Sequence, residues 1–143
     1  LKSAWWAYKG YADITGNLVD IPRTSELIGI GGKDASAGNA NFVIGALEDV
    51  GSVTLRFKNI DSAPYLNSNG SIQVVVRRVL YTGNDPAKKP LEVLNKNVQV
   101  TNNEILIVLP DFKKSQIFLV NLIGIPLDVS GASANPKSSL KEQ

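Results

Sequence analysis

Hydrophobic and polar residues alternate along most of the chain. In residues 52–58, the apolar side chains of Val53, Leu55 and Phe57 fall on one face, and polar or charged side chains fall on the other. A period of two residues is typical of a β-strand with one buried face. Residues 71–81 repeat this pattern over a longer run, which predicts a long strand.

Turn-forming residues divide the rest of the chain into short strands. Asn102 and Asn103 separate two of them and predict a two-residue hairpin, because asparagine tolerates positive φ. The predicted fold is all-β: an antiparallel β-sandwich, jelly-roll-like, with one short N-terminal helix. The predicted strands cover residues 17–21, 26–30, 41–47, 52–58, 71–81, 91–94, 98–101, 105–109 and 116–122.

Two of the predicted segments are apolar on both faces, residues 105–109 and 117–120. One face of each is expected to fill the core of the sandwich. The other face is either covered by another element or exposed for a partner. The sequence leaves these two alternatives open.

The N-terminus has a different period. Apolar residues recur there every three or four positions, which is helical spacing; they are Leu1, Ala4, Trp5, Tyr8, Tyr11 and Ala12. Ser3 can cap the helix, and Gly16 lies where a left-handed residue would end it. The predicted organisation is an aromatic helical lead-in over residues 1–16, a β-sandwich domain over residues 17–129, and a flexible tail or linker over residues 130–143.

Composition narrows the function. The formal net charge is only +2, from 15 basic and 13 acidic residues, so we expect neither nucleic acid nor a membrane surface as a partner. The chain has no histidine and no cysteine, which excludes nucleophilic catalysis built on either residue. Glycoside hydrolysis needs two carboxylates at a defined separation, but the acidic residues here are dispersed. We therefore expect a chain that is not an enzyme.

Aromatic residues are the candidates for ligand binding. Trp6 falls on the helix face opposite Trp5 and Tyr8. We expect those two to pack, while an exposed Trp6 would stack on a sugar ring or contact a neighbouring domain. Tyr65 and Tyr81 adjoin loops, where tyrosine either stacks on a pyranose or closes the end of the sandwich. The predicted ligand-binding residues are Trp6, Tyr65 and Tyr81, with Trp5 and Tyr11 behind them.

Two other features have plainer interpretations. Residues 29–32 (Gly-Ile-Gly-Gly) resemble a phosphate-binding loop superficially, but no strand–helix unit surrounds them. They are expected to form a turn. No cofactor is expected either. Oxygen-bearing side chains in residues 33–41 and 61–69 supply some ligands for a structural calcium ion, but their spacing matches no calcium-binding loop.

Residues 5–16, WWAYKGYADITG, resemble the end of the last barrel helix in some clan-A glycoside hydrolases, including family 39-like enzymes. In those enzymes this helix leads into a β-sandwich appended to the catalytic barrel, and residues 17–21 and 71–79 resemble strands of such a sandwich. The resemblance implies that this chain is an accessory domain of a larger secreted enzyme. The catalytic residues of that enzyme would then lie on a barrel outside these 143 residues.

Two functions fit this resemblance. The first is a carbohydrate-binding module that binds a plant-type polysaccharide or oligosaccharide by aromatic stacking and polar contacts. The second is a structural accessory β-sandwich that packs against the catalytic domain of the same polypeptide without binding sugar itself.

Overall fold

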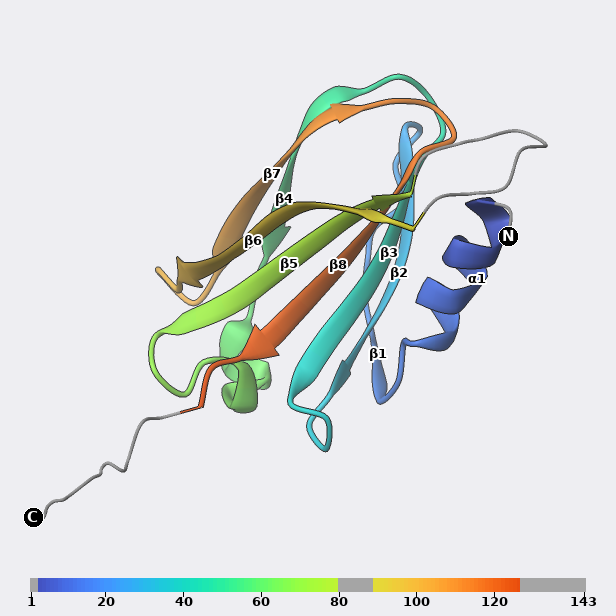
Figure 1. Cartoon of the computed structure of the whole chain (residues 1–143). Coiled ribbons are helices and arrows are strands. Elements are labelled where there is room, and N and C mark those ends of the chain that lie inside the picture. Colours follow the sequence, from blue (N-terminus) through green and yellow to red (C-terminus); the bar gives the residue numbers. More distant parts are fainter. Residues whose placement is uncertain (1–2, 80–88, 127–143) are drawn as a thin grey trace, which may run out of the picture.

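The computed structural model describes residues 3–79 and 89–126, with side chains from residue 6 onward. The prediction of an all-β antiparallel sandwich with one short helix is confirmed (Figure 1). No helix in the described part of the chain is long and apolar enough to cross a membrane. The elements in chain order are α1 (Ser3–Ala12), β1 (Asn17–Val19), β2 (Leu27–Asp34), β3 (Asn39–Ala46), β4 (Gly51–Phe57), the 3-10 turns η1 (Ile60–Ser62) and η2 (Pro64–Leu66), β5 (Ser71–Val79), β6 (Leu91–Gln99), β7 (Ile105–Phe112) and β8 (Ile117–Gly124).

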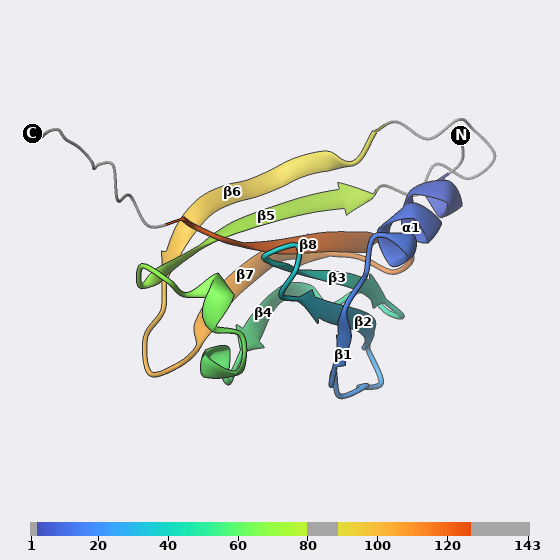
Figure 2. The ribbon, with the colours of Figure 1, turned by 90° about the horizontal axis from the view of Figure 1, so that it is seen from below.

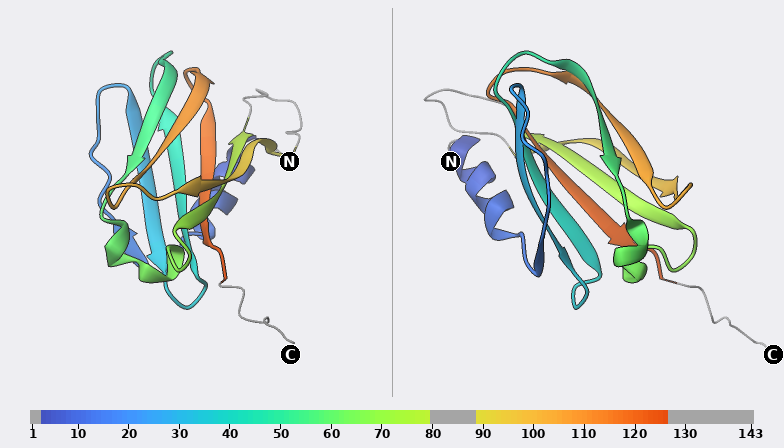
Figure 3. Two further views of the ribbon diagram at one scale, coloured as in Figure 1. Left: turned by 90° about the vertical axis from the view of Figure 1, so that its left-hand side faces the viewer. Right: turned by 180° about the vertical axis from the view of Figure 1, so that it is seen from behind.

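The strands form two sheets of unequal size. Six strands pair in the order β1-β2-β3-β8-β5-β6, and β4 pairs with β7 to form the second sheet. Every pairing is antiparallel. The large sheet curves around the small one, as Figure 2 shows. The small sheet and α1 lie on opposite sides of the large sheet (Figure 3).

The core fills the space between the two sheets. On β5, Ile72, Val74 and Val76 are fully buried, as the alternation predicts. Phe112 of β7 and Phe118 of β8 meet edge to face in this core, with their ring centroids 4.5 Å apart. Edge-to-face pairs of this kind stabilise a core by about 0.5–1.5 kcal/mol beyond the area that they bury.

The hairpin between β6 and β7 also agrees with the prediction. Asn102 and Asn103 both have positive φ, 53° and 64°, and Thr101 and Glu104 form a bridge beside them. Upstream, residues 91–94 and 98–101 were expected to be two strands, and the structure joins most of them into β6. Residues 95–97, which join the two predicted strands, pair in regular register with β5, and the one register shift lies between Val76 and Arg77.

Residues 29–32 are not a turn, which corrects the prediction. They lie inside β2. A Cβ atom at Gly31 would overlap the ring of Phe42, and one at Gly32 would lie 2.8 Å from Ile14 Cγ2. The glycines are therefore required for close packing on both faces of β2, a demand that has the same sequence signature as a turn.

The helix ends before the predicted position. Its last residue is Ala12, so Gly16 does not cap it. Gly16 has a φ of 78° and stands at the entry to β1, where a side chain would collide with the carbonyl of Lys33. The positive φ was anticipated correctly, but it serves the approach of β1 to β2.

Candidate functional site

Helix α1 packs on the outer face of the large sheet through a glycine. A Cβ atom at Gly10 would lie 2.6 Å from Leu119 Cδ2 on β8 and 3.3 Å from Val43 Cγ2 on β3. The helix backbone therefore approaches the sheet closely at this point. Trp6, one turn earlier on the same side of the helix, is half-buried. Helix α1 thus covers the outer face of β8 at Leu119.

Two aromatic residues of α1, Trp6 and Tyr8, have the opposite exposure to the one predicted. Tyr8, expected to pack, is 75% exposed, and Tyr11 is 59% exposed. Trp6, expected on the outer face, is half-buried. Helical spacing identifies which residues share a face, but the close approach at Gly10 decides which face meets the sheet.

The other predicted binding residues do not join these tyrosines. Tyr65 lies in η2, where it packs against the core. Burial, together with the nearby charge of Asp34, raises the pKa of the Tyr65 phenol. In Figures 1 and 3 the 3-10 turns lie away from α1, across the large sheet. Tyr81 and the side chain of Trp5 lie outside the described residues. The described candidates therefore form no single aromatic platform.

A ladder of polar side chains crosses the outer face of the large sheet and ends at α1. Arg77 Nη1 on β5 donates to Asn121 Oδ1 on β8 at 2.8 Å. Asn121 Nδ2 donates to Asn41 Oδ1 on β3 at 2.6 Å. Asn41 Nδ2 donates to the carbonyl of Asp13, just past the helix, at 3.0 Å. The ladder ties three strands to the end of α1. Its sequence signal, which the sequence analysis did not use, is the presence of asparagines in two otherwise apolar strands, Asn39 and Asn41 in β3 and Asn121 in β8.

Acidic side chains do not converge in the described part of the chain, where no group of three or more His, Cys, Asp or Glu residues is placed to hold a metal ion. Asp34 Oδ2 accepts a hydrogen bond from the Thr15 hydroxyl at 2.6 Å, and Oδ1 accepts from the backbone amides of Ser36 and Ala37. The Thr15 hydroxyl, followed by these amides, holds the pKa of the Asp34 carboxyl below its usual value. This carboxylate links the segment after α1 to the turn between β2 and β3.

Besides the exposed tyrosines of α1, the molecule has an exposed apolar surface on strand β7. Leu106 and Val108 point away from the core and are 52% and 59% exposed. On β4, their partners across the small sheet are Arg56 and Thr54, both exposed. Of the two strands predicted to be apolar on both faces, β8 is therefore covered and β7 is open.

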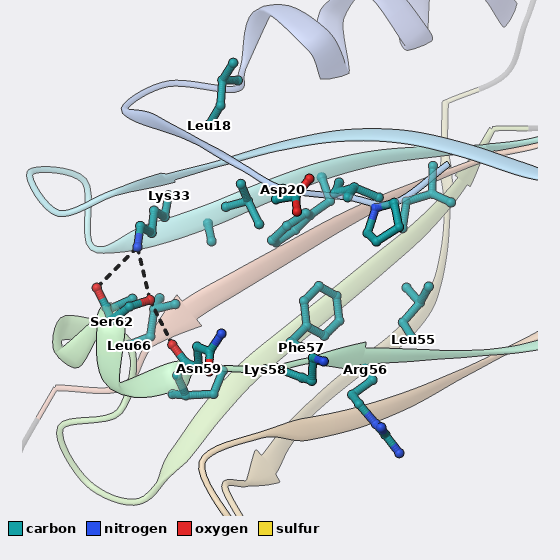
Figure 4. A pocket seen from close by; sticks show the side chains of 18 residues that line it. Leu18, Asp20, Lys33, Leu55, Arg56, Phe57, Lys58, Asn59, Ser62 and Leu66 are labelled. Atoms are coloured by element: carbon teal, nitrogen blue, oxygen red, sulfur yellow. Dashed lines mark hydrogen bonds between the residues drawn. The ribbon is translucent and has the colours of Figure 1, made fainter. Parts of the chain in front are cut away.

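An open groove of about 540 Å³ separates β1 and β4 (Figure 4). Figure 4 shows the ring of Phe57 directed into it from β4, while Arg56 points away. Lys33 on the opposite wall donates to Ser62 Oγ at 3.0 Å. The apolar residues that line the groove include Val19, Ile21, Phe42, Ile44, Leu55 and Phe57.

Comparison with known proteins gives matches in structure only. No protein-family model matches the chain, and no curated protein sequence matches it. The structure described as N2152 from Neocallimastix frontalis superposes with a TM-score of 0.79 and 26% identity; the match covers 87% of this chain and 31% of that one. The GH39 enzyme from Xanthomonas axonopodis pv. citri has a TM-score of 0.63 and 16% identity, covering 85% of this chain and 30% of the enzyme.

The chain therefore spans less than a third of either structural neighbour. The likeness to the Xanthomonas enzyme agrees in fold with the resemblance noted from residues 5–16. This chain therefore has the fold of one part of the longer Xanthomonas enzyme.

Proposed function

We propose that the chain is a structural accessory β-sandwich of a glycoside hydrolase, and that it packs on the catalytic domain of the same polypeptide through the outer face of α1. In this role the chain binds no substrate and carries no catalytic residue. The structural neighbours support the first part of the proposal, because a domain of this fold makes up only 31% and 30% of their chains.

The exposure of Tyr8 and Tyr11 is the observation that carries the proposed contact. The two residues are three positions apart on α1, so their side chains are neighbours on the helix surface. Both rings face away from the sheet that the helix covers and are largely exposed. Tyrosine is enriched at protein interfaces because it combines a large apolar ring with a polar hydroxyl. A second domain that covers α1 would bury both rings.

Polysaccharide binding is the second candidate function. Exposed tyrosines also stack on pyranose rings, and Tyr11 is one of the residues predicted to do so. Structural packing is favoured because Trp6 is half-buried and Tyr65 is partly buried against the sandwich core. The two remaining rings occupy about one turn of a helix, which leaves a short surface for a polymer.

The first test is affinity electrophoresis of the chain against soluble xylan, mannan and β-glucan, with a pull-down on cellulose. The wild type and the double variant Tyr8→Ser/Tyr11→Ser should both migrate unretarded, and neither should hydrolyse these glycans. Retardation of the wild type that the double variant abolishes would replace the structural function with sugar binding.

The second test uses the longer polypeptide that carries the chain. Differential scanning calorimetry should show the sandwich and catalytic domain unfolding together in the wild type. The Tyr8→Ser/Tyr11→Ser variant should separate the two transitions, because it weakens the contact between domains. The matched control, Leu106→Ser/Val108→Ser, removes a similar exposed apolar area from β7 and should leave them joined. The opposite result would place the interface on β7.

A further inference from the structure

The two sheets have four edge strands, and three of them are protected against pairing with another chain. In the large sheet, β1 has three residues and is followed by Pro22, while β6 carries Glu92 and Lys96. In the small sheet, β7 contains Pro110. Short length, charge and proline are the usual ways in which an edge is blocked.

Strand β4 is the least protected of the four. It has seven residues, Gly51–Phe57, with no proline and one charged residue, Arg56. Its register shifts only at its start, between Gly51 and Val53, and within the described residues it pairs with β7 alone. Its unpaired side therefore presents a row of backbone amides and carbonyls, which is a template for a further strand. The small sheet has two strands where the large sheet has six.

The unpaired side of β4 borders the groove described above. The groove is lined from β4 by Leu55 and Phe57, and from the far side by Val19 of β1 and by Ile21. Phe42 also lines the groove and is in edge-to-face contact with Phe57, with 4.9 Å between the ring centroids. An apolar groove of about 540 Å³ beside a free strand edge is a place where another segment can bury apolar side chains and pair its backbone.

We infer that the groove holds an extended β-strand that pairs with β4 and is supplied by the same polypeptide from outside these 143 residues. The inference rests on the proposed function in one respect, because it takes the strand from the longer polypeptide. A strand suits this site better than a sugar, because its backbone satisfies the edge of β4 while alternate side chains enter the groove.

The chemistry of the groove describes the strand. Residues that face inward meet Leu55, Phe57 and Ile21 and should be apolar. Lys33 and Lys58 line the groove with one carboxylate, Asp20, while the guanidinium of Arg56 lies 3.6 Å from Glu104. The positive excess favours acidic residues on the outward side of the strand.

Hydrogen–deuterium exchange of β4 tests the inference. The exchange of residues 51–57 is compared between the 143-residue chain and the longer polypeptide. These amides should exchange on the order of tenfold more slowly in the longer polypeptide, because the added strand protects them. The central strand β8 should exchange alike in both. Equal exchange of β4 in the two would overturn the inference.

Paired variants in the longer polypeptide identify what protects β4. Leu55→Glu places a charge in the groove and should abolish the protection, whereas Thr54→Glu on the exposed face of the same strand should retain it. Lys58→Glu leaves the core intact and should weaken the protection by repelling an acidic strand; Lys96→Glu on β6 is its control. Loss of protection in Thr54→Glu alone would mean that a domain covers the outer face instead.

Other occupants give different results, and each would overturn the inference. A second copy of the chain would make β4 protection depend on the concentration of the 143-residue chain. A sugar would protect β4 in that chain when xylo- or cello-oligosaccharides are added. Failure of the proposed contact at α1 is distinguishable, because Tyr8→Ser/Tyr11→Ser should leave β4 protection unchanged in the longer polypeptide.

Discussion

Strands β7 and β8 have similar composition and different surroundings. Both alternate between a buried face and a second apolar face. β8 lies between β3 and β5 in the middle of the large sheet, and α1 covers its outer side at Leu119. β7 is an edge strand of the small sheet, and its outer residues Leu106 and Val108 are exposed.

The two faces of a strand depend on different parts of the sequence. The inner face of each strand follows from the alternation in its own sequence, because every second side chain points the same way. The outer face depends on which distant segments arrive beside and above the strand. For β8 these are β3, β5 and α1. For β7 the neighbouring strand is β4, and Leu106 and Val108 on its outer face stay exposed.

Mutations on the inner faces should lower the free energy of unfolding most. The loss should be similar for β7 and β8, because both inner faces are buried. Phe112 and Phe118 are both fully buried. Phe112→Ala and Phe118→Ala should each lower the free energy of unfolding by about 3–5 kcal/mol, measured by urea denaturation. The double variant should lose less than the sum, because the two rings contact each other. Additive losses would contradict a direct ring contact.

Mutations on the outer faces should destabilise the protein more in β8 than in β7. Leu119→Asp places a charge beneath α1 and should lower the free energy of unfolding by about 2 kcal/mol or more. Val108→Asp adds the same charge to an exposed position and should change it by about 1 kcal/mol or less. Urea denaturation of the two variants provides the measurement, and similar losses would mean that α1 does not cover β8 in solution.

The polar ladder over β8 should make an intermediate contribution to the free energy of unfolding. Asn121→Val leaves Arg77 and Asn41 without their shared partner, which should cost about 1–3 kcal/mol. Both tryptophans of the chain, Trp5 and Trp6, belong to α1, so their fluorescence reports on the helix. We expect a shift of the emission in Asn121→Val. An unchanged spectrum and unchanged stability would show that the ladder does not anchor α1.

The smallest expected effect depends on pH. The pKa of Asp34 is held below its usual value, so its contribution is present above the unfolded pKa of about 3.9 and is lost as pH falls through the folded pKa. Asp34→Asn should therefore flatten the decline of the melting temperature between pH 5 and pH 2.5 relative to the wild type. Asp111→Asn on β7, where the exposed carboxylate contacts Lys113 at 3.3 Å, is the control. A wild-type-like decline in Asp34→Asn would contradict this role.

Several features of the fold could be predicted because they depend on neighbours in sequence. The alternation in residues 52–58 and 71–79 placed the inward side chains correctly, and Asn102 and Asn103 located the hairpin. The predicted binding residues have mixed surroundings in the structure. Tyr11 is exposed, whereas Trp6 is half-buried and Tyr65 packs against the core. The groove beside β4 had no signal, because it is lined by segments from several strands.

The class of fold, the inner face of each main strand and the hairpin at Asn102 follow from side-chain period and backbone preference, so they could be predicted from the residues alone. The role of each glycine depends on the folded chain. Gly10 brings α1 onto β8, and Gly31 makes room for Phe42. The folded chain also leaves β8 covered while β7 and the edge of β4 remain open. The physical reason is that exposure belongs to contacts between segments distant in sequence, which no local pattern encodes.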